Sequence, residues 1–321
     1  MTTRTTSLLT MAFLLAMPAL LIATVVQPLA GAEAFTPPAV DPARLREHVR
    51  TLSVDFYPRN HRRIDQLGAS ADYIEAQMKA AGAVVVRQEV RVDGVAYHNV
   101  IARFGPKEGA LLVLGAHYDS AGATPGADDN ASGVAGLLEL ARLLASAPQA
   151  RPIELVAYTL EEPPHFRSKN MGSVWHARQL AAAGREVRLM LSLEMIGYFS
   201  DAPGSQRYSI PAMTYLYGDR GDFIALVGQY ADFGATRKAK SLMAGASDLP
   251  VYSINAPRSM QGIDYSDHRS YWAQGYPALM VTDTAFLRNA NYHKAGDTHD
   301  KLDYARMAKV VQAVYALSQQ Y

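Results

Sequence analysis

Potential metal ligands or bases follow three apolar runs of this chain, each of a length typical of a buried β-strand. His117 follows the first run and Glu194 follows the third. Glu161 and Glu162 follow the second. In sheets of parallel strands the carboxyl ends meet at one edge, and chemistry gathers there. We therefore expect these four side chains to lie close together.

Two further residues extend this set. Asp129 lies in the segment 125–133, where acids immediately precede a predicted helix, and His293 lies in a loop before the last predicted helix. Imidazole and carboxylate groups form a nitrogen and oxygen ligand set that suits zinc or a similar divalent ion. Singly, each has an ordinary explanation, such as a hydrogen-bonded His or a helix N-cap Asp. Their shared position at one sheet edge favours a metal site.

The composition narrows the function classes. The 321 residues are 49% hydrophobic and 19% charged, which is ordinary for a globular protein with a sizeable core. Lys and Arg total 31 against 30 Asp and Glu, so no overall field favours nucleic acid or an anionic lipid surface. Cysteine is absent, which excludes disulfides, thiol nucleophiles and thiolate metal sites. Any metal must therefore be bound by His and carboxylate groups.

Apolar patterns predict alternating strands and helices along most of the chain. A hairpin is predicted first, because two β-branched runs flank the turn Asp93-Gly94. The predicted strands cover residues 84–92, 97–104, 110–116, 153–160, 187–193 and 278–282. The predicted helices cover residues 41–53, 66–82, 132–145, 172–183, 222–233, 266–273 and 303–318. This succession predicts a three-layer α/β/α fold, in which helices cover both faces of a mixed, largely parallel twisted sheet.

The N-terminus is similar to a secretory signal peptide. Arg4 precedes an apolar run over residues 8–26, and small residues follow in Ala30-Gly31-Ala32. We expect residues 1–32 to be removed, which leaves residues 33–321 as a single domain, either periplasmic or secreted. The alternative is an uncleaved membrane anchor, because the run has 19 residues and about 20 span a bilayer. Membrane contact is expected only in that case.

The spaced motifs resemble those of the M28 zinc peptidases, the co-catalytic zinc aminopeptidases and their relatives. They span residues 84–321 in order and are far more specific than a single His-x-Asp. The resemblance implies a zinc exopeptidase fold and a hydrolase that acts on peptides. The motifs are His117-x-Asp119, Asp129-Asn130, Glu161-Glu162, Glu194-Met195, Ser266-Asp267-His268, Tyr292-His293 and Asp297-Thr298.

The resemblance also implies a set of metal ligands. Asp129 corresponds to a carboxylate that bridges two zinc ions. His117 and Glu194 would complete the site of one zinc, and Glu162 and His293 would complete the site of the other. Two zinc ions about 3.5–4 Å apart can share one water, lower its pKa towards neutrality and polarise the scissile carbonyl.

Catalytic and supporting roles follow from the same resemblance. Glu161 would be the general base, and Tyr292 matches a tyrosine that donates a hydrogen bond to the developing oxyanion in some members. Asp119 would orient a ligating His and raise its basicity. The Asp129-Asn130 peptide is expected to be cis.

Several functions remain open on this fold. The leading one is an aminopeptidase that hydrolyses the N-terminal residue of peptides through a metal-bound water, with nearby carboxylates holding the free amine. The second is a glutaminyl-cyclase-like acyltransferase, although related cyclases use one zinc and lack the first His, which is present here as His117. A carboxypeptidase or dipeptidase also fits. A non-catalytic binding ectodomain is disfavoured, because all five ligand positions and Glu161 are filled.

The chain departs from the family pattern in two places. Glu194 stands where dinuclear members often carry Asp. An insert over residues 163–170 begins beside the metal ligands, and its Arg167 is a candidate to bind a carboxylate. Asp267 and His268 are expected to support the site. The loops expected to shape an apolar substrate pocket are 163–170, 199–210 and 240–265.

Overall fold

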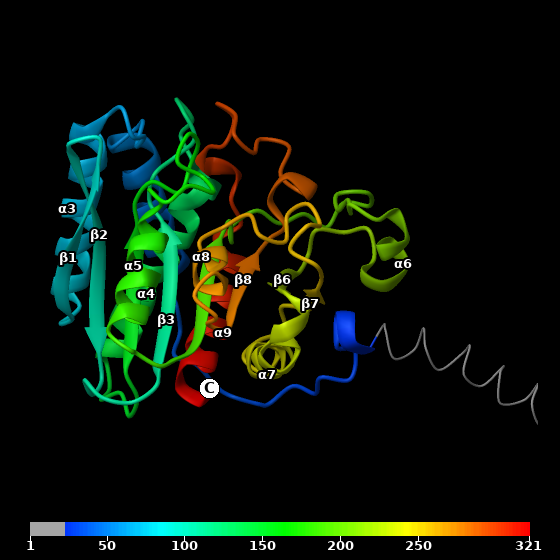
Figure 1. Cartoon of the computed structure of the whole chain (residues 1–321). Helices are drawn as coiled ribbons and strands as arrows, with labels where there is room; N and C mark the ends of the chain where they lie inside the picture. Colours follow the sequence, from blue (N-terminus) through cyan, green and yellow to red (C-terminus); the bar gives the residue numbers. More distant parts are fainter. Residues whose placement is uncertain (1–22) are drawn as a thin grey trace, which may run out of the picture.

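The computed structural model describes residues 23–321, whose strands form one mixed sheet (Figure 1). The strand order is β1-β2-β4-β3-β5-β8-β6-β7. The four central strands β4, β3, β5 and β8 run parallel, β2 joins β4 antiparallel, and β6 joins β8 antiparallel. The strands are β1 Val84–Val92, β2 Val95–Phe104, β3 Leu111–His117, β4 Ile153–Tyr158, β5 Val187–Glu194, β6 Ile224–Gly228, β7 Val251–Asn255 and β8 Ala278–Thr282.

Helices cover both faces of this sheet, which confirms the predicted three-layer fold. One face packs against α2 Pro42–Arg50, α3 Ile64–Ala80, α4 Gly133–Ala145, α7 Phe233–Ala244 and α9 Tyr304–Gln320. The other face packs against α5 Gly172–Ala182 and α8 His268–Trp272. The short helix α6, Thr214–Tyr217, lies apart from both layers on a projection at the right of Figure 1.

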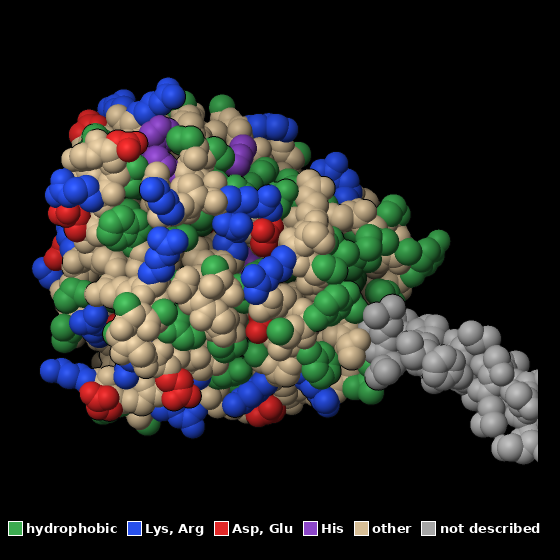
Figure 2. Space-filling model, in the orientation of Figure 1, with side chains coloured by type: hydrophobic (Ala, Val, Ile, Leu, Met, Phe, Trp, Pro, Cys, Tyr) green, Lys and Arg blue, Asp and Glu red, His purple; other side chains and the backbone are tan. Residues whose placement is uncertain are grey.

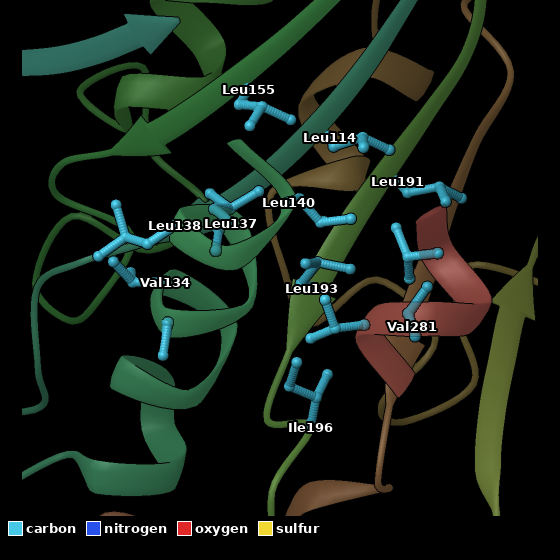
Figure 3. Close-up of a cluster of buried hydrophobic side chains, with 14 of the residues drawn as sticks. Leu114, Val134, Leu137, Leu138, Leu140, Leu155, Leu191, Leu193, Ile196 and Val281 are labelled. Atoms are coloured by element: carbon cyan, nitrogen blue, oxygen red, sulfur yellow. The ribbon is translucent and has the colours of Figure 1, made fainter. Parts of the chain in front are cut away.

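The core divides between the two faces of each central strand. In β3, Leu112 and Leu114 pack on the α4 face, whereas Leu111 and Val113 pack on the α5 face. Figure 3 shows the α4 side of this core, where leucines of α4 lie against leucines of β3, β4 and β5. Burial on both faces explains why these strands are continuous apolar runs in the sequence.

The hairpin prediction is confirmed, and one helix prediction is wrong. β1 and β2 pair antiparallel around Asp93 and Gly94, whose φ angles of 49° and 84° are those of a type I′ turn. Residues 222–233 were expected to be helical, but they contain β6, and α7 begins only at Phe233. β7 was not predicted. Both strands have five residues, and so short an apolar run does not show whether it is strand or helix.

The predicted targeting segment lies mostly beyond the described part of the chain. Residues 1–22 fall outside it, and residues 23–32 are included. Over residues 23–321, none of the helices combines the length and the apolar character needed to cross a bilayer.

Gly115 of β3 generates a stability prediction. A Cβ atom there would lie 2.3 Å from Cε2 of Tyr158, a fully buried ring whose hydroxyl is hydrogen-bonded to Tyr271. We expect Gly115→Ala to lower the free energy of unfolding by about 1–3 kcal/mol, measured by urea denaturation, because the ring must shift within a packed core. Gly68→Ala on α3 is the control, because a Cβ there meets nothing within 4 Å. Equal stability of the two variants would contradict the prediction.

Candidate active site

The structure brings all five predicted metal ligands together in two groups that share one residue. The first group is His117, Asp129 and Glu194, and the second is Asp129, Glu162 and His293. In each group, one potential ligand atom from every residue lies within 4.8 Å of the others. Only His293 is exposed, with 33% of its side chain accessible. The arrangement matches the ligand set expected from the sequence.

The two oxygens of Asp129 face different groups. Oδ1 lies 3.4 Å from Nε2 of His117, which is also 3.3 Å from Oε2 of Glu194. Oδ2 lies 3.1 Å from Nε2 of His293, which is 3.2 Å from Oε2 of Glu162. A carboxylate with one oxygen towards each imidazole can bridge two cations.

Strand ends and one irregular segment position these residues. His117 is the last residue of β3 and Glu194 the last of β5, whereas Glu162 follows β4 by four residues. Asp129 lies in the segment Ala127–Ser132 before α4, and the expected cis peptide between Asp129 and Asn130 is present. The Asn130 side chain donates to the carbonyl of Leu193 at 2.8 Å. This bond ties the segment to β5 close to Glu194.

Asp119 holds the two glutamates through their backbone. Its Oδ1 accepts the N–H of Glu161 at 3.1 Å, and its Oδ2 accepts the N–H of Glu162 at 3.0 Å. Its carboxylate also lies 3.5 Å from Nδ1 of His117, on the side of the ring that faces away from Asp129. Asp119 therefore contacts the His that it was expected to orient, and it also fixes the turn after β4.

A second carboxylate and a buried arginine fix the segment that carries Asp129. Asp297 accepts the backbone N–H groups of Asp128 and Asp129, one on each oxygen and both at 3.0 Å. Arg59 is fully buried and donates to the carbonyls of Tyr118 and Gly126. Asp297 belongs to the motif Asp297-Thr298, to which no role was assigned from the sequence. The sequence did not single out Arg59 as a functional residue, because it is one of several arginines in the same loop.

Ser266 supports the site more directly than its two neighbours. Its hydroxyl donates to Oε2 of Glu194 at 2.8 Å and is hydrogen-bonded to Ser192. Asp267 is buried, and neither of its carboxylate oxygens has a hydrogen-bond partner in the described chain. His268 contacts the carbonyl of Ile263 at 2.8 Å. Support from this motif therefore comes from Ser266.

Burial and crowded charge shift the pKa values of the cluster. Burial would raise the pKa of Asp129, but the nearby imidazoles of His117 and His293 lower it below its ordinary value. Burial raises the pKa of Glu162 to about 7, and the charge of Asp129 adds to this effect. Burial opposes the charged form of His293, yet the neighbouring carboxylates of Asp129 and Glu162 raise its pKa to about 11.

These shifts have a common origin that suits a divalent cation. Burial raises the pKa of Glu161 well above its ordinary range and also raises that of Glu194, so four carboxyl groups compete around two imidazoles. Oδ2 of Asp129 and Oε1 of Glu162 are buried without a hydrogen-bond partner. Buried oxygens of this kind are costly unless they bind a proton or a metal ion. The residues present therefore fit zinc.

Glu161 and Tyr292 lie beside the two groups without belonging to either. Oε2 of Glu161 is 4.0 Å from Nε2 of His117, and the carboxylate is buried. The Tyr292 ring stacks on the His293 ring with centroids 3.9 Å apart. Burial raises the pKa of the Tyr292 hydroxyl above its ordinary value, so the hydroxyl stays protonated and can donate a hydrogen bond.

A largely apolar cavity of about 110 Å³ adjoins these residues. Glu194 and Tyr292 line it together with side chains from β6, β7, β8 and the loops around them. The expected pocket loops 199–210 and 240–265 both contribute, through residues such as Tyr208 and Met260. The remaining lining is mainly aromatic and aliphatic: Met213, Tyr217, Phe223, Ala225, Val227, Tyr252, Ile254, Ile263, Tyr265, Met280, Phe286 and Leu287.

The insert 163–170 packs beside this cavity. Arg167 does meet a carboxylate, but within the chain: its guanidinium pairs with Asp264 and lies 5.0 Å from the centroid of the Tyr265 ring, which lines the cavity. Phe166 contacts the same tyrosine ring at 5.8 Å. The insert thus supports the pocket wall formed by Tyr265.

Relatives of this chain share its sequence over most of its length. The family model of peptidase family M28 matches residues 99–318. The uncharacterized protein YfbL of Escherichia coli (strain K12) is 50% identical over 299 residues, which are 91% of this chain and 92% of that protein. Leucine aminopeptidase 1 of Uncinocarpus reesii is 26% identical over 234 residues, 68% of this chain and 53% of that protein. The match with the fungal enzyme thus spans about half the length of that relative.

Solved structures share the fold. LapB from Legionella pneumophila aligns with a TM-score of 0.69 at 22% identity, covering 86% of this chain and 71% of that chain. A glutaminyl cyclase from Bacteroides thetaiotaomicron aligns with a TM-score of 0.63 at 19% identity, covering 89% of this chain and 100% of that chain. At these identities the likeness establishes the fold, and activity must be argued from the site. The family match covers more than half of the chain and includes every proposed ligand, and the chain belongs to peptidase family M28.

Proposed function

We propose that this protein is an aminopeptidase that removes the N-terminal residue from peptides and that it binds two zinc ions. His117, Asp129 and Glu194 would hold one ion, and Asp129, Glu162 and His293 the other. The observation that carries the proposal is the position of Asp129, whose two carboxylate oxygens face the two imidazoles separately. When bound, zinc supplies a Lewis acid for the scissile carbonyl and lowers the pKa of a water molecule.

Glu161 is the proposed general base. Its carboxylate lies next to the first ligand group without belonging to it, so it is free to accept a proton from the attacking water. It can then deliver that proton to the leaving amine. The hydrogen bond that the backbone N–H of Glu161 donates to Asp119 keeps the Glu161 carboxylate in place beside the ligands. Tyr292 can donate a hydrogen bond to the oxyanion as it develops, a contact of a kind worth about 2.7–4 kcal/mol in the transition state.

The electrostatics of the site favour the amino end of a peptide. Glu161 and Glu194 are buried carboxyl groups beside the proposed reacting centre, and such groups attract the cationic α-amine. The apolar cavity that begins at Glu194 and Tyr292 suits the side chain of the residue to be removed. We therefore propose peptides with a free amine and a large apolar N-terminal residue as substrates.

A mixture assay with the full chain in mild detergent tests this proposal. Free-amine and N-acetylated peptides are incubated together, and the products are read by mass spectrometry. We expect loss of the N-terminal residue from the free-amine peptides alone, abolished by a chelator and restored by zinc.

Other outcomes identify the competing activities. Trimming from the carboxyl end would indicate a carboxypeptidase. Loss of water or ammonia from N-terminal Glu or Gln would indicate a cyclase, an outcome that the presence of His117 disfavours. No change in any peptide would favour a non-catalytic binding protein.

The assigned roles of Glu161 and His117 predict different losses. Glu161→Gln keeps the size of the side chain but removes the base, so kcat should fall by at least about 100-fold while zinc content stays unchanged. His117→Ala should lose one zinc ion and most of the activity. Elemental analysis and peptide turnover measure both effects. Near-normal turnover by Glu161→Gln would exclude Glu161 as the base, and unchanged zinc content in His117→Ala would exclude His117 as a ligand.

Ala225 offers a test of the side-chain pocket. It lies on β6 and lines the cavity, so Ala225→Leu should fill part of the space next to the bound side chain. We expect kcat/KM for peptides with N-terminal Leu or Phe to fall by about 10- to 200-fold. Peptides with N-terminal Ala serve as the control, because a methyl group does not reach into the cavity. If Ala225→Leu left the ratio of kcat/KM for Leu or Phe peptides to kcat/KM for Ala peptides unchanged, the substrate side chain would have to bind elsewhere.

A further inference from the structure

We propose that this protein keeps its N-terminal apolar run as a membrane anchor, and that the α6 projection rests in the lipid interface beside it. The α6 projection is the segment of residues 208–218, which contains α6. This proposal concerns the surface that meets the bilayer and does not depend on which peptides the site hydrolyses.

Residues just before the expected cleavage site are part of the folded domain. Val26 and Gln27 are buried, and both their carbonyls accept hydrogen bonds from Nζ of Lys240, at 2.9 and 3.0 Å. The Gln27 side chain donates to Oδ1 of Asn255 and accepts from Oγ of Ser253, both at 2.7 Å. The end of the apolar run is therefore bound to α7 and β7.

Cleavage near Ala32 would remove these partners. Oγ of Ser253 is buried, and within residues 23–321 its hydrogen bonds go to Gln27 and the carbonyl of Val26. Nζ of Lys240 is partly buried and donates to the same two residues. A buried polar group that loses its partner typically costs about 1–3 kcal/mol. The contacts therefore favour the alternative in which the segment stays attached, over removal of residues 1–32.

The α6 projection has the composition of a membrane-interface surface. It carries no charged residue from 208 to 218, and three of these residues are tyrosines. Tyr215 is 93% exposed, Leu216 is 50% exposed and Ile210 is 45% exposed. Figure 2 shows hydrophobic side chains gathered at the right of the molecule, where Figure 1 draws α6. Tyrosine and aliphatic side chains on one exposed segment are typical of surfaces that lie at the level of lipid headgroups.

The anchor and the projection meet at one residue of the domain. The hydroxyl of Tyr217 donates to the carbonyl of Ser253 at 2.7 Å, and the hydroxyl of Ser253 donates to the carbonyl of Val26 at 2.9 Å. Val26 is itself the last residue of the 19-residue apolar run, so no linker separates the run from the domain. A bilayer that holds the run must lie next to this face.

This continuity selects lipid as the occupant of the exposed surface. A second copy of the chain could also cover the α6 projection. A second copy, however, would not explain why the projection lies beside the end of the apolar run, whereas a bilayer that holds the run would. Residues 8–25 of the run precede the buried Val26, and these 18 residues fall within the range of about 17–25 that can cross the hydrocarbon layer as a helix. The interface of the same bilayer is therefore the partner that the covalent connection supplies.

The experiment uses the absence of natural cysteine in this chain. A polarity-sensitive fluorophore is attached to the full-length variant Tyr215→Cys, and the protein is reconstituted into vesicles of phosphatidylcholine and phosphatidylglycerol. Val84→Cys is the matched control, because Val84 is 67% exposed and lies on β1, the opposite edge strand of the sheet. We expect a blue shift and quenching by bromine-labelled lipids at position 215 and neither effect at position 84.

Three results would overturn the proposal. The first is an intact mass that begins at residue 33 for the protein recovered from cells, because the anchor would then be lost. The second is equal fluorescence at positions 215 and 84 in vesicles. The third is a blue shift at position 215 in detergent that grows with protein concentration, because a second copy would then cover the projection. Peptide turnover by each labelled protein, compared with the unlabelled chain, reports separately whether the site is intact.

Discussion

The architecture of the site depends on holding several carboxyl groups close together in a buried place. Asp129, Glu161, Glu162 and Glu194 lie within or beside two overlapping groups that contain two imidazoles. Like charges at such distances repel strongly where the dielectric constant is low. Because the carboxylates repel one another, their side chains would not adopt this arrangement by themselves, and the backbone must hold them in place. Three strand ends and one irregular segment do so, and the proposed zinc ions would supply the compensating positive charge.

The backbone is held in turn by Asp119, Asp297 and Arg59, three residues outside the proposed ligand set. Asp119 fixes the turn after β4 and Asp297 fixes the segment before α4, each through two backbone N–H groups. Arg59 complements these two acids, because burial lowers its pKa only to about 10, which leaves it cationic at neutral pH. Its guanidinium bonds to main-chain carbonyls, so its charge acts on the surrounding carboxylates through space. Rigid supports of this kind keep ligand atoms in place for catalysis.

Much of this site was predictable from the sequence because its ligands follow buried strands. His117 and Glu194 end continuous apolar runs, and the motif order connected Asp129 and His293 to them. Arg59 was not predictable, because its role depends on carbonyls of residues far along the chain. β6 and β7 were missed for a related reason. They lie beyond β8 and complete the sheet on the side of the cavity, and such short apolar runs acquire a strand conformation only from their neighbours.

The parts that the sequence predicted and the parts that it did not correspond to two regions of the site, the ligand edge and the cavity. The ligand edge uses the parallel centre of the sheet, where His117, Glu162 and Glu194 are positioned by the strands that precede them. The cavity instead uses the α6 projection together with β6 and β7, two strands that join the rest of the described sheet where β6 pairs with β8. Tyr208 and Tyr217 of the projection line the cavity, and Ser253 of the cavity wall bonds to Val26 at the end of the apolar run. Contacts at the N-terminal segment therefore bear on the pocket wall and leave the ligand edge unchanged, because no described hydrogen bond joins that segment to the ligands.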